Sequence, residues 1–108
     1  MIDAMDLDPD NPLAIEIRQE MAASYFAACK KMVVALEALH TFDRTVASST
    51  LDNEQTMRRC ELLDEAAELA YFVVIQRESM NLSCFNQFFE AYGIPREVRT
   101  RLRPKRQN

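Results

Sequence analysis

The chain contains one glycine, Gly93, and neither glycine nor proline occurs between Leu13 and Met80. These two residue types interrupt helices most strongly, since proline removes a backbone donor and glycine adds conformational freedom. Apolar residues in this stretch recur at helical spacing and do not alternate as in a strand. The sequence therefore predicts an all-α fold, in which two long antiparallel helices form a helical hairpin and one or two short helices follow at the C-terminal end.

The first long helix is expected to begin at Pro12, with Asn11 as its N-cap, and to continue to about Val46. Asparagine is a favoured capping residue, and proline fits the first helical position because its missing N–H is not needed there. One apolar stripe runs along this helix and predicts its packing face. The stripe consists of Ala22, Tyr25, Phe26, Cys29, Met32, Val33, Leu36, Leu39 and His40.

Polar side chains concentrate in residues 47–52, between the two long periodic segments. Serine, threonine and aspartate compete with helical hydrogen bonds and favour turns, so the chain is expected to reverse here. The second helix should then run from about Asn53 to Met80 with Asp52 as its N-cap. Its predicted apolar side contains Cys60, Leu62, Leu63, Ala66, Ala67, Leu69, Ala70, Val73 and Val74.

The segment from Leu69 to Ile75 is apolar on every side of the predicted helix. Such a segment needs cover on more than one face, and one short further helix does not cover two long rods. We therefore expect a homodimer that packs as a four-helix bundle with coiled-coil-like contacts. The expected dimer contacts are Tyr71, Val74 and Ile75. The alternative is a monomeric bundle in which the first helix is kinked or broken near Lys30 and Lys31, or frayed before Met21.

After the second helix, residues 81–83 offer a further N-cap, and an aromatic helix is predicted to end with Gly93 just past its last turn. Pro95 should open a last short helix that reaches Leu102. The aromatic helix is expected to cover the hairpin like a lid, or to border a groove for a partner helix. The residues of this expected groove are Phe85, Phe88, Phe89 and Tyr92.

The net charge of −4 is unevenly distributed, because residues 96–108 carry six basic side chains and one acidic one. We expect an acidic flexible N-terminus over residues 1–11, a single helical domain over 12–103 and a basic disordered tail over 104–108. The expected contacts for a polyanion are Arg96, Arg99, Arg101 and Arg103. A helix-turn-helix is a poor match, because Phe89 and Arg99 stand where that motif has a small and an apolar residue.

Residues able to carry chemistry are few. His40 is the only histidine, and with Glu37 it forms a Glu-x-x-His pair of the kind that holds metals in helical bundles. The acidic residues of the second helix, however, project away from its apolar side. Cys29, Cys60 and Cys84 are expected to be buried free thiols. We therefore expect no catalytic residue, no metal and no cofactor, and do not expect an enzyme.

The longest wholly apolar run has seven residues, far below the roughly 20 that a membrane-spanning helix needs. The first ten residues contain four aspartates and no basic residue, unlike a secretory or transit peptide, so a cytoplasmic location is expected. These properties favour a small non-catalytic protein–protein interaction module, such as an adaptor, a chaperone-like binder or a regulator. The alternative is a nucleic-acid-binding regulator that uses the arginine-rich C-terminal segment.

Overall fold

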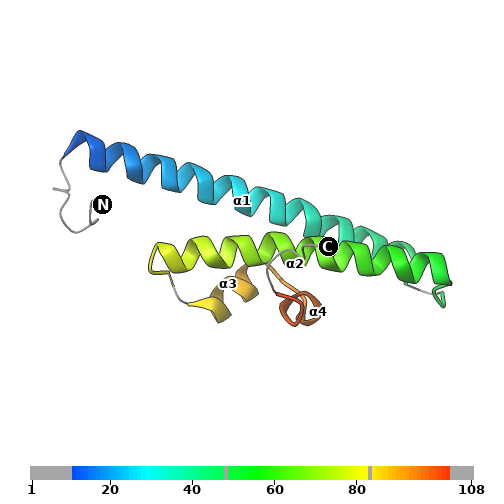
Figure 1. Cartoon of the computed structure of the whole chain (residues 1–108). Coiled ribbons are helices and arrows are strands. Elements are labelled where there is room, and N and C mark those ends of the chain that lie inside the picture. The colour runs from blue at the N-terminus through cyan, green and yellow to red at the C-terminus, as the bar shows by residue number, and fades with distance from the viewer. Residues whose placement is uncertain (1–10, 48, 83, 103–108) are drawn as a thin grey trace, which may run out of the picture.

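The computed structural model describes residues 11–47, 49–82 and 84–102, and in these ranges it contains helices and no strand. Figure 1 shows two long antiparallel helices followed by two short ones. The helices are α1 (Pro12–Thr45), α2 (Asn53–Ser79), α3 (Phe85–Ala91) and α4 (Arg96–Arg99). The predicted all-α hairpin is confirmed, with α1 continuous over 34 residues. Residues 1–10 and 103–108, which include most of the predicted N-terminal segment and the whole predicted tail, lie outside the described residues.

Both long helices begin at the predicted caps. The side-chain Oδ1 of Asn11 accepts a hydrogen bond from the Leu13 N–H at 2.8 Å, and Pro12 occupies the first helical position. Asp52 and Gln55 form a reciprocal capping box: Asp52 Oδ1 accepts from the Gln55 N–H at 2.7 Å, and Gln55 Oε1 accepts from the Asp52 N–H at 3.1 Å. These bonds satisfy backbone donors that a helix start otherwise leaves free.

Two helices end in the same left-handed motif. Gly93 follows α3 with φ +61°, as predicted, and the Ile94 N–H donates to the Phe89 carbonyl at 2.9 Å. Asn81 follows α2 with the same φ, a conformation that asparagine tolerates better than most residues. Asn81 therefore belongs to the end of α2. The prediction that it helps to cap the next helix is wrong, because the N-cap of α3 is Cys84, which makes no side-chain capping bond.

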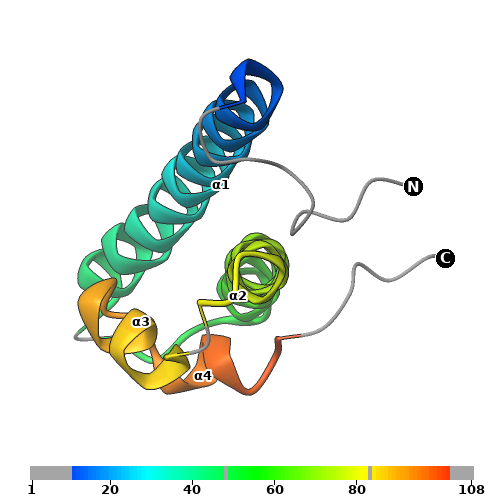
Figure 2. The ribbon, with the colours of Figure 1, turned by 90° about the vertical axis from the view of Figure 1, so that its left-hand side faces the viewer.

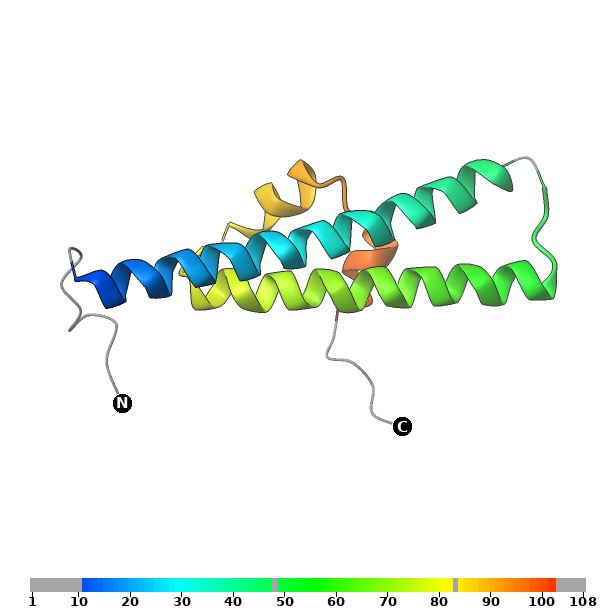
Figure 3. The same cartoon turned by 90° about the horizontal axis from the view of Figure 1, so that it is seen from above.

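The two short helices lie on one side of the hairpin, where α4 packs against α2 (Figures 1 and 2). The N-terminal turns of α1 extend past the end of α2, as Figure 3 shows from above. The radius of gyration is 17.5 Å, against about 13 Å for a compact domain of this length. Within the described residues, the molecule is thus an elongated hairpin whose short helices cover one side.

The core lies between α1 and α2 and is closed by the short helices. Met32 of α1 and three α2 residues, Ala66, Ala70 and Val73, have no exposed surface. The small alanine side chains allow the two long helices to approach closely. Phe88, Ile94 and Val98 complete the core from α3, α4 and the segment between them. Among the described residues, no helix combines the length and the hydropathy that crossing a bilayer requires.

Several residues of the predicted apolar stripes are exposed. His40 follows the buried Leu39 by one residue and therefore points about 100° away from the α2 side of α1. Phe26 is 67% exposed, because neither α2 nor the short helices cover that flank of α1. Cys60 and Cys84 are exposed, so only Cys29 fits the prediction of buried thiols, although all three cysteines are free.

Candidate protein interface

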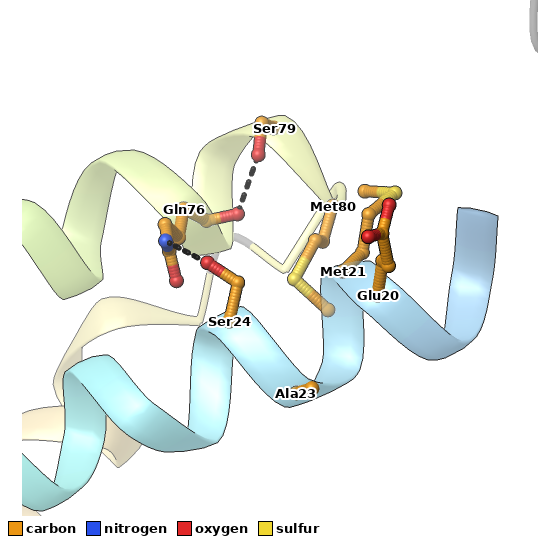
Figure 4. A pocket seen from close by; sticks show the side chains of 7 residues that line it. All are labelled: Glu20, Met21, Ala23, Ser24, Gln76, Ser79 and Met80. Atoms are coloured by element: carbon orange, nitrogen blue, oxygen red, sulfur yellow. Dashed lines mark hydrogen bonds between the residues drawn. The ribbon is translucent and has the colours of Figure 1, made fainter. Parts of the chain in front are cut away.

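The side of the hairpin opposite α3 and α4 carries a groove between the two long helices, called the open groove from here on. Figure 4 shows its first section, near the C-terminal end of α2. Gln76 Nε2 donates to Ser24 Oγ at 3.1 Å, which joins the two helices at this point. The lining residues are Glu20, Met21, Ala23, Ser24, Gln76, Ser79 and Met80.

The middle section of the open groove is more apolar and has charged rims. Its lining residues are Ala27, Lys30, Lys31 and Val34 from α1, with Glu65 and Leu69 from α2. Val34 is 60% exposed. Phe72, three residues after Leu69 and one turn before Gln76, is 54% exposed. Large apolar side chains therefore stand in solvent along this side of the hairpin, with lysines on one rim and a glutamate on the other.

The opposite side of the hairpin is closed by packing and polar contacts. The Arg77 Nη1 donates to the Tyr25 hydroxyl at 2.9 Å, and its guanidinium lies 5.0 Å from the centre of the Phe88 ring. Phe88 is 3% exposed. The short helix α3 is thereby held against both α1 and α2. No comparable helix is available for the open groove in the described part of the chain.

The aromatic residues expected to form a partner groove mostly point inward. Phe88 belongs to the core, and Phe85 and Phe89 are partly buried. Only Tyr92 is exposed, at 37%. The three phenylalanines therefore lie against the hairpin, which fits the predicted lid, and Tyr92 alone of the four stays open to a partner.

The three expected dimer contacts lie in different surroundings. Val74 packs against the core, and Tyr71 is half-buried. Ile75 is 41% exposed. The neighbouring Phe72, which the sequence reasoning did not select, is the most exposed large side chain of the apolar segment. The exposure of Phe72 could have been predicted from the helical spacing, because this residue lies outside the stripe of α2 that faces the core.

A polar clamp, formed by Arg59, Asp43 and Glu97, joins three helices and was missed in the sequence. Arg59 Nε and Nη2 donate to the Asp43 carboxylate at 2.9 and 3.2 Å, and Nη1 and Nη2 donate to Glu97 at 2.7 and 2.9 Å. These hydrogen bonds lower the pKa of both carboxyl groups and raise the pKa of the guanidinium. Arg59 lies one turn before the buried Leu63 and therefore on the apolar side of α2. A cation on that side could have indicated that Arg59 pairs with acidic side chains.

Two of the four arginines expected to meet a polyanion are engaged within the chain. Arg99 Nε donates to the Ile94 carbonyl at 2.9 Å, with its guanidinium over the Phe89 ring. Arg101 Nη1 donates to Asp64 Oδ1 at 2.8 Å, which raises the pKa of that arginine. Arg96 is exposed, and Arg103 lies outside the described residues.

The groups considered for chemistry are scattered. Glu37, His40 and Arg44 line a shallow surface hollow. Within the described ranges, no three histidine, cysteine or acidic side chains are grouped closely enough to bind a metal. The buried Cys29 interacts with Tyr92, and this contact together with burial raises the pKa of Tyr92 to about 12. Burial likewise raises the pKa of Tyr25.

Comparison with models of protein families, with curated protein sequences and with solved structures finds no match for this chain. The open groove has exposed apolar side chains and, in its middle section, lysines on the α1 rim and a glutamate on the α2 rim.

Proposed function

We propose that this chain is a non-catalytic helical interaction module, acting as an adaptor, a chaperone-like binder or a regulator that holds another polypeptide along the open groove. The observation that carries the proposal is the exposure of Val34, which lines the open groove, and of Phe72, which lies within one turn of the lining residues Leu69 and Gln76 on α2. Contiguous apolar side chains with a polar border are typical of protein contact surfaces. Here the border is supplied by Lys30, Lys31 and Glu65.

The shape of the open groove favours a helical partner. Two long neighbouring helices present an elongated channel, and a third helix packs into such a channel through residues spaced three and four apart. On α1 the channel is lined by the small residues Ala23, Ser24 and Ala27, which leave room for a partner's larger side chains. The hydrogen bond between Ser24 and Gln76 fixes the two walls at one end before a partner binds.

A photo-crosslinking amino acid tests the proposal in the native cell. It would replace Phe72, and in a matched control it would replace Phe26, which is similarly exposed but lies on the other flank of α1. We expect protein adducts from position 72 and few from position 26. Equal labelling at both positions, or no adduct at position 72, would show that the open groove is not the binding surface.

A further inference from the structure

We propose that the polypeptide held along the open groove is a second copy of this chain, related to the first by a two-fold axis that runs parallel to the hairpin. In this arrangement α1 of each copy lies on α2 of the other, and four long helices form a bundle. The inference rests on the proposed function and names its partner. Three features of the open groove carry it: the placement of charge, the sizes of facing side chains and the area available.

The rim charges distinguish the two ways in which identical hairpins can face each other. Lys30 and Lys31 on the α1 rim line the same section of the open groove as Glu65 on the α2 rim, which lies about one turn further along the hairpin. An axis parallel to the hairpin keeps these levels and places α1 over α2, so the lysines of one copy lie within about one turn of the glutamate of the other. An axis perpendicular to the hairpin, lying within the interface, places α1 over α1 and α2 over α2, and brings like charges together where it passes through this section. Opposite charges at an interface select the first arrangement.

The apolar side chains fit the same arrangement. The bond between Gln76 and Ser24 sets these residues level with each other. One turn further along each helix, Phe72 is level with Ala27. When α1 of the second copy lies over α2, the exposed Phe72 ring of one copy meets the small Ala27 of the other, and the contact occurs twice. A large side chain facing a small one is how packed helix faces interdigitate.

The area of this side agrees with a stable dimer. The 27 residues of α2 give a length of about 40 Å, and two adjacent helices give a width of about 20 Å. The side therefore offers about 800 Å² on each copy, which is the usual contribution of one partner to a specific protein interface. Covering it would bury Phe72 and Val34, which are exposed in the single chain.

Sedimentation equilibrium of the full chain gives the first test. We expect a dimer whose dissociation constant rises at least tenfold in Phe72→Glu and changes less than threefold in Phe26→Glu, since only the first residue faces the open groove. Far-UV circular dichroism checks that helix content is kept, and Val34→Glu replaces Phe72→Glu if the latter loses it. A monomeric parent chain, or a dimer that resists both groove variants, would overturn the inference.

Charge reversal tests which two-fold arrangement is present. With α1 over α2, Glu65→Lys should weaken the dimer at least fivefold, because a lysine then faces lysines. Adding Lys30→Glu and Lys31→Glu in the same chain should restore it. With α1 over α1, residue 65 faces α2 of the other copy and not the lysines, so the added Lys30→Glu and Lys31→Glu changes would not restore the dimer and the proposed axis would be wrong.

The crosslinker at position 72 separates failure of this inference from failure of the proposed function. An adduct of twice the chain mass, with the link mapped near Ala27, supports both. An adduct with a different protein leaves the interaction module standing and overturns the second copy as its partner. Absence of any adduct, together with a monomeric parent chain, overturns both.

Discussion

Replacing Arg59 with methionine removes the cation of the polar clamp while keeping most of the apolar length of the side chain. Arg59 is 24% exposed, and its partners Asp43 and Glu97 are 40% and 55% exposed. Pairs this accessible to water contribute about 0.2–1 kcal/mol each. The loss also leaves two neighbouring carboxylates without their shared cation. We therefore expect Arg59→Met to lower the free energy of unfolding by about 1–2 kcal/mol at pH 7.

Urea denaturation followed by circular dichroism measures this change, and the thermal midpoint should fall by roughly 5–15 °C. Arg58→Met is the matched control, because Arg58 pairs with Glu61 in the same helix and both side chains are more than half exposed. We expect the control to lose less than about 0.5 kcal/mol. Hydrogen exchange should accelerate in the α4 region of Arg59→Met, since Glu97 belongs to that helix.

The pH dependence provides the decisive check. The pKa values of Asp43 and Glu97 are lowered in the folded chain by their bonds to Arg59. Their contribution to stability is therefore complete above the unfolded values near pH 4 and declines as the pH falls through the folded values. The stability difference between the parent chain and Arg59→Met should shrink below about pH 4. Equal stability at pH 7, or an undiminished difference at pH 2.5, would refute the clamp as a stabilising contact.

Three further variants test other parts of the fold. Val74→Asp should destabilise the chain by about 2 kcal/mol or more in urea, because Val74 packs against the core, while Ile75→Asp should cost much less; similar losses in both would contradict this burial pattern. Gly93→Ala should cost about 1 kcal/mol, because φ is +61° and the added methyl group meets no atom within 4 Å, so only backbone strain is expected; an unchanged midpoint would argue against the left-handed conformation. Cys29→Ala should lower the pKa of Tyr92 from about 12 toward 10, as ultraviolet titration would show, since the thiol is the main cause of the raised value; a constant value would assign the shift to burial.

The helix boundaries could be predicted because their causes are local. Asn11 with Pro12, Asp52 with Gln55, and Gly93 act on the backbone within a few residues of themselves. The same locality explains the misassigned Asn81. An asparagine is favoured both at the start of a helix and at the left-handed position after the end of a helix. In this chain Asn81 occupies the left-handed position after α2.

The candidate interface could not be predicted as well, because it depends on which side of the hairpin the short helices cover. Phe72 and Val74 are two residues apart in one apolar segment, yet Val74 packs against the core and Phe72 is exposed. Helical periodicity gives the direction of each side chain relative to its neighbours but not the position of α3 and α4. The Arg59–Glu97 pair, which spans 38 residues of sequence, has the same dependence on tertiary placement.

The polar bridges explain why one side of the hairpin is closed and the other open. Helices of seven and four residues do not persist alone, so α3 and α4 need contacts that hold them in place. Arg59 binds Glu97 of α4 to Asp43 of α1, and Arg101 binds Asp64 of α2. All these bonds, together with Val98 in the core, draw the C-terminal segment to the same side. The described chain has no remaining helix for Phe72 and Val34, and this uncovered side is the one that the proposed second polypeptide would occupy.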